Sequence, residues 1–140
     1  MSAMVRWTVE YEGDAFARFY SSLPEYEQAV LTAAIEHVLS VLGIDICESE
    51  WGKPLGGGLY EFRIRRSLRA ILTAASIDAT AAASGRPVLL RVFCGFHGER
   101  VVLLYGGYDK QRDPSTRRQQ REIRRARQVH MAWRERRVGE

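Results

Sequence analysis

Two apolar runs in the second half of the chain, residues 88–96 and 100–106, most constrain what it can fold into. Both are rich in Val and Leu, the first also contains two Phe residues, and the short segment His97-Gly98 lies between them. Apolar runs of this length joined through a glycine turn are typical of a β-hairpin. The sequence therefore predicts two neighbouring antiparallel strands, and Gly106-Gly107 is expected to end the sheet.

Two further segments alternate between apolar and polar residues, as strands with one buried face do. In residues 59–66 the even-numbered positions from 60 to 64 are apolar, whereas Glu61, Arg63 and Arg65 share the opposite face. Two arginines on one side of a strand predict a cationic surface. Residues 5–11 alternate in the same way, so they predict another half-buried strand.

Helical spacing follows the first strand. Residues 15–20 predict a short helical stretch, and a longer helix is expected from Pro24 to Gly43. Proline loses nothing in a first turn, and the acids Glu25 and Glu27 favour that end of a helix. Apolar residues then recur at helical spacing between positions 31 and 42, which indicates one buried face.

Two segments interrupt this regular pattern. Residues 44–58 are expected to form an irregular, flexible lead-in, because Gly52, Pro54 and three consecutive glycines break regular elements. Residues 67–87 predict a short helix with Ser67 as a possible cap, then an alanine-rich linker. We interpret this second segment as an insertion into a hairpin, within a single domain spanning residues 1–140.

A long C-terminal helix is predicted from Asp113-Pro114 to about Arg137, with Asp113 as its cap and Pro114 in its first turn. Its apolar stripe is thin, and arginine fills much of the rest of the helix. The predicted fold class is therefore α+β. A small antiparallel sheet of about four strands carries two N-terminal helices, and a long basic helix closes the chain.

Charge is distributed unevenly along the sequence. The net charge is +4, yet residues 1–50 carry two arginines against nine acids, and residues 110–140 carry eleven bases against four acids. Such a gradient suggests a polyanion such as RNA, an acidic protein, or both as partners. A helix whose two ends merely differ in sign would look the same.

Cysteine usage and hydropathy favour a cytoplasmic protein. Cys47 and Cys94 lie far apart and form no metal-binding motif, so reduced thiols are expected. Residues 1–10 do not resemble a signal peptide, and no run approaches the roughly 20 apolar residues of a membrane span. We expect no metal ion, no small-molecule cofactor and no membrane partner.

Several short strings resemble those of the RelE/ParE superfamily of toxins, particularly HigB-like and phage-derived members. Residues 57–64, GGLYEFRI, are similar to the family's G-G-L-[YW]-E-[LF]-R-[VI] strand. Residues 90–93, LRVF, and the run from VVLL at 101 to YDK at 108–110 resemble its next two strands. Asp113-Pro114 with EIRRAR at 122–127 resembles its closing helix. The strings keep the family's order and cover most of the chain apart from residues 67–87.

The resemblance implies the toxin of a type II toxin–antitoxin system. Many such toxins are ribosome-dependent endoribonucleases that cut mRNA, so the resemblance implies the ribosome, mRNA and a cognate antitoxin of the helix-turn-helix type as partners. The ParE branch instead inhibits DNA gyrase and is not a nuclease. An inactive domain that only binds nucleic acid or a partner protein is a third reading.

Metal-free RNA cleavage requires a base for the ribose 2′-hydroxyl, cations for the phosphate, and an acid for the leaving oxygen. The candidate catalytic residues are Arg63, Arg91, Tyr108 and Lys110. Arg63 matches the family arginine and suits phosphate stabilisation, although a salt bridge to Glu61 would also explain it. Arg91 interrupts an apolar run, where a charge must be paired or used. Tyr108 and Lys110 follow the last strand, where the family places its C-terminal catalytic group.

Further basic residues are candidates for holding the RNA backbone. They are Lys53, Arg65, Arg117, Arg118 and Arg121, and ordinary solvated side chains are the alternative. His97 is expected to be a plain surface histidine in a turn, and His37 and His130 are expected to be structural. No histidine stands at the family's usual catalytic positions, so the general base stays unassigned.

Overall fold

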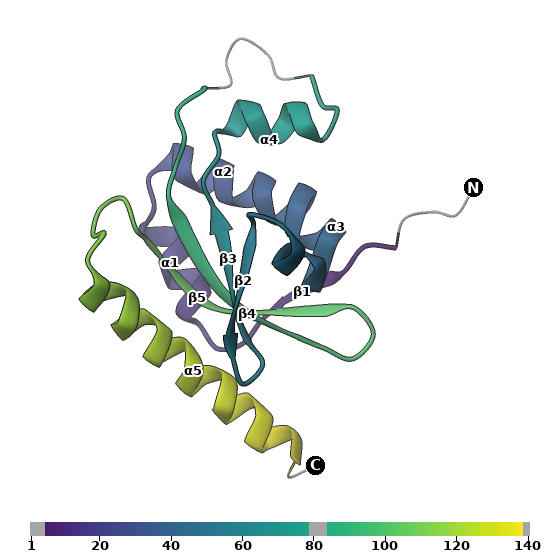
Figure 1. Cartoon of the computed structure of the whole chain (residues 1–140), viewed down its shortest axis with the longest axis vertical. Helices are drawn as coiled ribbons and strands as arrows, with labels where there is room; N and C mark the ends of the chain where they lie inside the picture. The colour runs from purple at the N-terminus through teal and green to yellow at the C-terminus, as the bar shows by residue number, and fades with distance from the viewer. Residues whose placement is uncertain (1–4, 79–83, 139–140) are drawn as a thin grey trace.

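The computed structural model describes residues 5–78 and 84–138 and shows an α+β fold built on a five-stranded sheet (Figure 1). The strand order is β1-β5-β4-β3-β2. The strands are β1 (Thr8–Tyr11), β2 (Gly52–Gly56), β3 (Leu59–Ile64), β4 (Leu90–His97) and β5 (Val101–Asp109). Neighbours are antiparallel except β1 and β5, which are parallel. The expected fold class is thus confirmed, with a mixed sheet.

The fifth strand lies in a segment that the sequence predicts to be irregular. Residues 44–58 contain most of a 3₁₀ turn, η2 (Gly43–Glu48), and all of β2. Pro54 is tolerated because β2 is an edge strand, where a missing N–H breaks no ladder. The glycines at 56, 57 and 58 all have positive φ angles and form the turn that returns the chain into β3. The prediction of an irregular, flexible segment over residues 44–58 was therefore wrong, because the glycines form a hairpin turn between β2 and β3.

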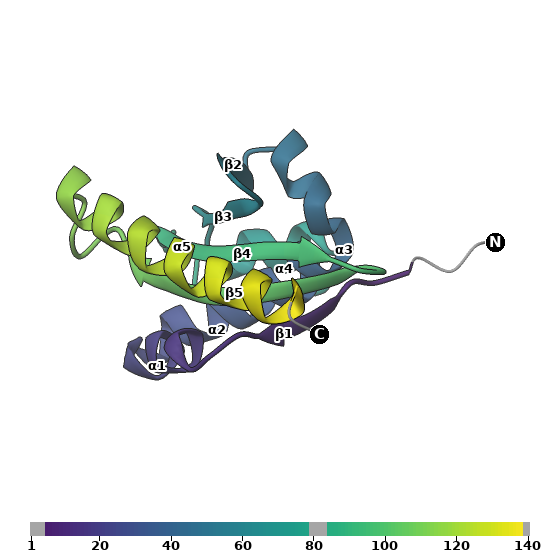
Figure 2. The ribbon, with the colours of Figure 1, turned by 90° about the horizontal axis from the view of Figure 1, so that it is seen from below.

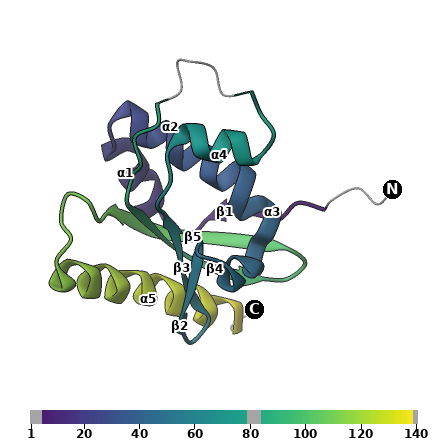
Figure 3. The same cartoon turned by 45° about the horizontal axis from the view of Figure 1, so that its top comes forward.

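Helices cover both faces of the sheet (Figures 2 and 3). One face packs against the N-terminal helical segments and α4, and the other packs against α5. The helical segments are α1 (Ala15–Ser22), α2 (Glu25–Ala34), the π-helical turn η1 (Ile35–Leu39), α3 (Ser40–Leu42), α4 (Leu68–Ala74) and α5 (Thr116–Val138). The face of β3 that carries Glu61 and Arg63 therefore lies against a second, smaller core that α5 covers.

The helical stretch Glu25–Glu48 is long and apolar enough, by length and composition, to resemble a membrane span. The expectation that no such run exists was therefore too strict. Val30, Leu31 and Leu39 are fully buried against the sheet, which explains the apolar composition as that of a core helix. Gly43 ends α3 with a φ of +54° and lies against the indole of Trp7, where a β-carbon would collide.

A bulge in β5 changes which residues face α5. Phe93 pairs with Gly106 and Cys94 pairs with Leu104, so the β5 strand has one extra residue, Tyr105. Strict alternation would send positions 105 and 108 to opposite faces, yet both tyrosines lie in the core beneath α5. The expectation that Gly106-Gly107 ends the sheet was wrong, because β5 continues to Asp109.

The C-terminal helix begins slightly later than predicted, at Thr116. Its cap is Ser115, whose Oγ accepts a hydrogen bond from the Arg118 N–H at 3.1 Å. Asp113 accepts from the Ser115 N–H at 3.2 Å and so fixes the preceding turn. Asp113 is therefore not the cap, although both residues have side chains that cap helices well.

The expected short helix after Ser67 is confirmed as α4, and the Ser67 Oγ accepts from the Ala70 N–H at 3.1 Å. Tyr26 of α2 ties both ends of the 67–87 segment down. Its hydroxyl accepts from the Leu68 N–H at 3.2 Å and donates to the Arg86 carbonyl at 2.5 Å. The alanine-rich positions 79–83 lie outside the described residues.

His130 locks α5 onto the sheet. Its Nε2 lies 3.0 Å from the Gly57 carbonyl and its Nδ1 lies 2.7 Å from the Tyr105 hydroxyl. A carbonyl only accepts, so Nε2 carries the proton and Nδ1 accepts from Tyr105. Burial lowers the pKa of His130, and the charges of Arg134 and Arg127 lower it further, against the effect of the Gly57 carbonyl. His130 therefore has the structural role that the sequence predicts, because both ring nitrogens bond to the sheet and its turn.

The two hydrogen bonds of His130 predict a free energy of unfolding that depends on pH. The pKa of His130 is lower in the folded chain than the ordinary value of 6.5, so below that value the unfolded chain binds a proton more readily. The free energy of unfolding should therefore fall as pH drops below about 6.5. His130→Gln should be less stable at neutral pH but should lose part of this slope in urea titrations. Gln128→Ala, at an exposed position of α5, should keep the full slope.

Candidate functional site at the end of the sheet

Three residues predicted to be catalytic stand side by side across the sheet. Arg63 on β3 pairs in register with Arg91 on β4, and Arg91 pairs with Tyr108 on β5. Cross-strand partners share a face and lie about 5 Å apart. The three residues are distant in sequence, and the fold brings them into one row at the end of the sheet near the start of α5.

A buried carboxylate, Glu61, holds this row together. Its side chain is fully buried, and its Oε1 accepts a hydrogen bond from Arg63 Nε at 3.1 Å. The same oxygen lies 3.5 Å from Arg91 Nε, so one carboxylate faces two guanidinium groups. The predicted alternation places Glu61 on the face of Arg63, but its burial could not be read from the strand alone. The structure therefore contains the Arg63–Glu61 ion pair that the sequence offered as the alternative to a catalytic role.

The residues of the row differ in depth. The side chain of Arg63 is 25% exposed, whereas that of Arg91 is 3% exposed and Tyr108 is buried. Tyr108 stacks on Phe93 with ring centroids 6.2 Å apart. Arg63 therefore offers its guanidinium at the surface, while Arg91 and Tyr108 lie beneath it.

Three buried polar atoms of the row and of Glu61 have no hydrogen-bond partner among the described residues. They are Glu61 Oε2, Arg91 Nε and the Tyr108 hydroxyl. Each such group costs on the order of 1–3 kcal/mol, so a chain selected for stability alone would not gather them in one place. Together with Glu61, the row forms a polar cluster on an otherwise apolar face of the sheet. Below, the cluster means Glu61, Arg63, Arg91 and Tyr108, with Lys110 after the end of β5.

The surroundings shift the proton affinities of three groups in the cluster. Burial lowers the pKa of Arg91, although Glu61 opposes this, and burial raises the pKa of Tyr108, with Glu61 adding to the effect. Burial also lowers the pKa of Lys110, and the charge of Arg91 lowers it further. Tyr108 therefore remains a hydroxyl donor, and Lys110 releases its proton more readily than a free lysine does.

Two other predicted residues lie around the outer side of the cluster. Lys53 on β2 pairs in register with Glu61, so it lies on the same face, and its side chain is exposed. Arg65 follows β3, is exposed, and donates to the Glu50 carbonyl at 3.3 Å. Arg63 and Arg65 both contribute to lowering the pKa of Lys110. The cationic surface predicted from β3 therefore extends over β2 and the end of β5.

The three arginines predicted at the start of α5 do not behave alike. Arg118 lies over the Tyr108 ring, with its guanidinium carbon 5.4 Å from the ring centroid, and it pairs with Glu122 at 3.1 Å. Arg117 and Arg121 are exposed. Arg118 joins the cluster, whereas the other two extend the basic surface of the helix.

The histidines and cysteines lie elsewhere. His97 is at the opposite end of β4 from Arg91, where its ring lies 4.8 Å from that of Trp133. Cys47 and Cys94 are both free thiols, and burial raises the pKa of Cys94. Within residues 5–78 and 84–138, no three His, Cys, Asp or Glu side chains are placed to hold a metal ion.

Comparison with known proteins gives one solved structure. No family model matches the sequence, and no curated protein matches it. The chain is similar to a chain of the toxin–antitoxin complex RelBE2 from Mycobacterium tuberculosis, with a TM-score of 0.50 and 17% identity. The likeness covers 78% of this chain and 97% of that chain. At this identity it shows a shared fold, in agreement with the RelE-like architecture expected from the sequence.

The Glu61 carboxylate is expected to be essential for stability. Glu61→Gln removes the charge between two arginines that are cross-strand neighbours, which should cost about 3 kcal/mol of unfolding free energy in urea titrations. Glu99→Gln, at an exposed position in the β4–β5 turn, is the matched control and should change little. Equal stability of the two variants would contradict the central role of Glu61.

Proposed function

We propose that this chain is the toxin of a type II toxin–antitoxin system and acts as a ribosome-dependent, metal-independent mRNA endoribonuclease. The observation that carries the proposal is the row of Arg63, Arg91 and Tyr108 around Glu61, with Lys110 directly after the end of β5. The RelE-like fold supports it, since the similar solved structure is itself a toxin–antitoxin complex. The basic surface suits a cytoplasmic protein that binds ribosome-held mRNA and is neutralised by an acidic surface of its antitoxin.

The depth of each residue suggests its part in the reaction. Arg63 is at the surface and would contact the scissile phosphate, where a planar guanidinium matches the phosphate oxygens. Arg91 is too deeply buried to reach RNA, so it would act through Glu61, by sharing that carboxylate with Arg63. We therefore assign Arg63 to the substrate and Arg91 and Glu61 to its positioning.

Lys110 is the best candidate in this cluster for a proton-transfer role. RNA cleavage removes a proton from the 2′-hydroxyl and delivers one to the 5′-oxygen. The lowered pKa of Lys110 makes its neutral amine more accessible, and a neutral amine can take the proton. Tyr108 keeps its proton and lies below the surface, where it can hold neighbouring groups by hydrogen bonding.

One observation favours a second function without catalysis. Within the described residues the cluster has no histidine, and Glu61 neutralises part of its positive charge. A protein that only binds an anionic or acidic partner would need no more than this. Inhibition of DNA gyrase and plain nucleic-acid binding both belong to this class. Purified protein that blocks supercoiling would favour the gyrase target.

Substitution of Arg63 tests the nuclease proposal. Induction of the wild-type chain should arrest growth and create new mRNA 5′ ends at codons within translated regions. Arg63→Ala should reduce cleavage by about 10²-fold or more, because a group that stabilises transition-state charge is lost. Arg66→Ala is the control, since Arg66 follows the same strand but pairs with Glu50. Growth arrest without new 5′ ends would exclude the nuclease.

Lys110 can be tested by the dependence of cleavage on pH. If its neutral amine takes the proton, cleavage on programmed ribosomes should rise with pH between about pH 6 and about pH 9. Lys110→Arg stays charged over this range, so it should lose about 10²-fold and the pH dependence with it. An arginine variant that retains the wild-type rate and profile would show that Lys110 supplies only charge.

A further inference from the structure

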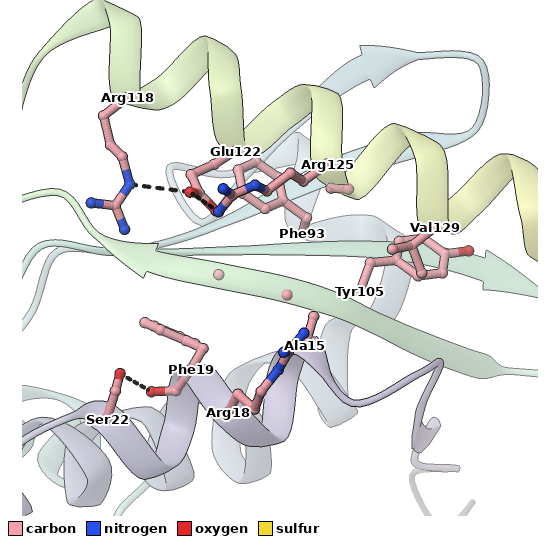
Figure 4. Close-up of a pocket in the computed structure, with 13 residues that line it drawn as sticks. Ala15, Arg18, Phe19, Ser22, Phe93, Tyr105, Arg118, Glu122, Arg125 and Val129 are labelled. Carbon is pink, nitrogen blue, oxygen red and sulfur yellow. Dashed lines mark hydrogen bonds and ion pairs between the residues drawn. The ribbon is translucent and has the colours of Figure 1, made fainter.

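The helix α1 separates two cavities. Figure 4 shows the one between α1 and α5, which Arg18, Arg118 and Arg125 help to line. These arginines are already paired, Arg18 with Asp14 and the other two with Glu122. The second cavity lies on the other side of α1, because its α1 residues interleave with those of the first at helical spacing. The α1 residues of the second cavity are Phe16, Ala17, Tyr20 and Ser21, and those of the first are Ala15, Arg18, Phe19 and Ser22.

The second cavity has a volume of about 460 Å³, which is a common size for a small-molecule site. Tyr11 at the end of β1 and two residues of α1, Phe16 and Tyr20, supply three aromatic rings to its lining. Ile35 and Glu36 of η1 complete it from the neighbouring helix. We call this cavity, with these five residues, the aromatic groove.

One ring of the aromatic groove has an open face. Tyr11 stacks on Phe16 with ring centroids 5.3 Å apart and an angle of 13° between the planes, and the Phe16 centroid lies 6.5 Å from that of Tyr20. Phe16 is buried, whereas Tyr11 is 62% exposed. The face of Tyr11 away from Phe16 is therefore accessible, and the face of an aromatic ring attracts cations.

The polar side chains of the aromatic groove offer acceptors and no positive charge. The chain has 21 lysines and arginines, yet no basic residue lines this groove within the described chain. The Glu36 side chain is 61% exposed, and the ion pair that it makes among the described residues is with His37, at 3.9 Å. The Tyr20 hydroxyl and Thr32 Oγ1, 3.1 Å apart, share one hydrogen bond and keep lone pairs for further donors. The lining therefore suits a ligand that is positively charged and rich in N–H groups.

A rare backbone form holds Glu36 at the groove. The helix changes from α to π form at Ile35, and π turns occur frequently at functional sites. The Glu36 carbonyl accepts from the Ser40 hydroxyl at 2.5 Å and from Arg6 Nη1 at 3.0 Å, so its backbone is fixed from two sides. Arg6 bonds to this carbonyl and does not line the aromatic groove. The π turn thus places a carboxylate without a lysine or arginine ion pair, among the described residues, next to the aromatic rings.

We propose that the aromatic groove binds a small organic cation, an ammonium or guanidinium group carried on an apolar stem. The cation lies between the open face of Tyr11 and the Glu36 carboxylate, and the stem lies along Ile35 and the ring edges. A cation gains from both the ring and the carboxylate, whereas a neutral molecule of the same shape gains from neither. Phe16 belongs to the core under α1 and α2, and Tyr108 to the core beneath α5. The groove is therefore on the other face of the sheet from the cluster, and the proposal does not depend on whether the Arg63 row cleaves RNA.

Titration of the ¹⁵N-labelled full chain with benzylguanidinium, followed by amide NMR shifts, tests the proposal. Benzylurea is the neutral counterpart of this probe and should bind at least about fivefold more weakly, because it lacks the charge. Saturable shifts should centre on residues 11–21 and 32–36 and should spare α5.

Two substitutions place the cation. Glu36→Gln should weaken the binding of benzylguanidinium by about fivefold or more, since a charged hydrogen-bond acceptor is lost, and Glu36→Asp should restore most of the affinity. Tyr11→Leu should weaken it by about threefold, because the ring face is lost while an apolar side chain remains. Glu25→Gln is the matched control, since Glu25 is exposed on α2 and does not line the groove.

Other results would overturn the proposal. Equal affinities for benzylguanidinium and benzylurea would do so, as would equal affinities of Glu36→Gln and Glu25→Gln for the charged probe. Shifts that do not saturate, or that centre on Glu61, would show that the aromatic groove is not the site. An arginine-containing peptide that binds the same residues far more tightly than the probe would assign the groove to a protein partner instead. The amide spectrum of each variant shows directly whether it is folded, so misfolding is separated from lost binding.

Discussion

The structure depends on one buried carboxylate. Glu61 lies on β3, one strand in from the edge of the sheet, and its carboxylate faces the surface guanidinium of Arg63 and the buried guanidinium of Arg91. Two arginines at cross-strand positions would repel each other without it, and a lone carboxylate at this depth would not stay charged. The pairing therefore lets the sheet keep cations where an ordinary core would have aliphatic side chains. For this reason the candidate site and the core beneath α5 share residues, since Tyr108 belongs to both.

The long basic helix has a different role from the one its composition suggests. Its arginines look like a solvated, polyanion-binding surface, yet Arg127, His130 and Arg134 reach the carbonyls of the β2–β3 turn. The three consecutive glycines of this turn all have positive φ angles, and the turn directs its carbonyls toward α5. The helix thus covers the second face of the sheet by hydrogen bonds as much as by its thin apolar stripe. Arginines on its outer side remain available for partners.

Local patterns in the sequence predict local features well. The alternation of β3 places Arg63 and Glu61 on one face, and Ser67 caps α4 as expected. The features that the sequence does not predict are set by contacts between distant segments. The bulge that turns Tyr108 toward Arg91 depends on the pairing of β5 with β4. The burial of Glu61 depends on α5 crossing that face, and β2 exists as a strand because β3 offers it an edge.

The position of Arg118 links the cluster to the ion pairs at the start of α5. It lies over the Tyr108 ring at the cluster and beside Glu122 at the groove between α1 and α5. Asp113 and Glu122 both pair with Arg118, at 3.8 and 3.1 Å, and a shift of that guanidinium would change the charge above Tyr108. Tyr108 and Glu61 each have a buried polar atom that makes no hydrogen bond to the described residues. These atoms could form new hydrogen bonds if Arg118 moved. The ion pairs at the start of α5 and the charge at the Arg63 row are therefore expected to be coupled through this one side chain.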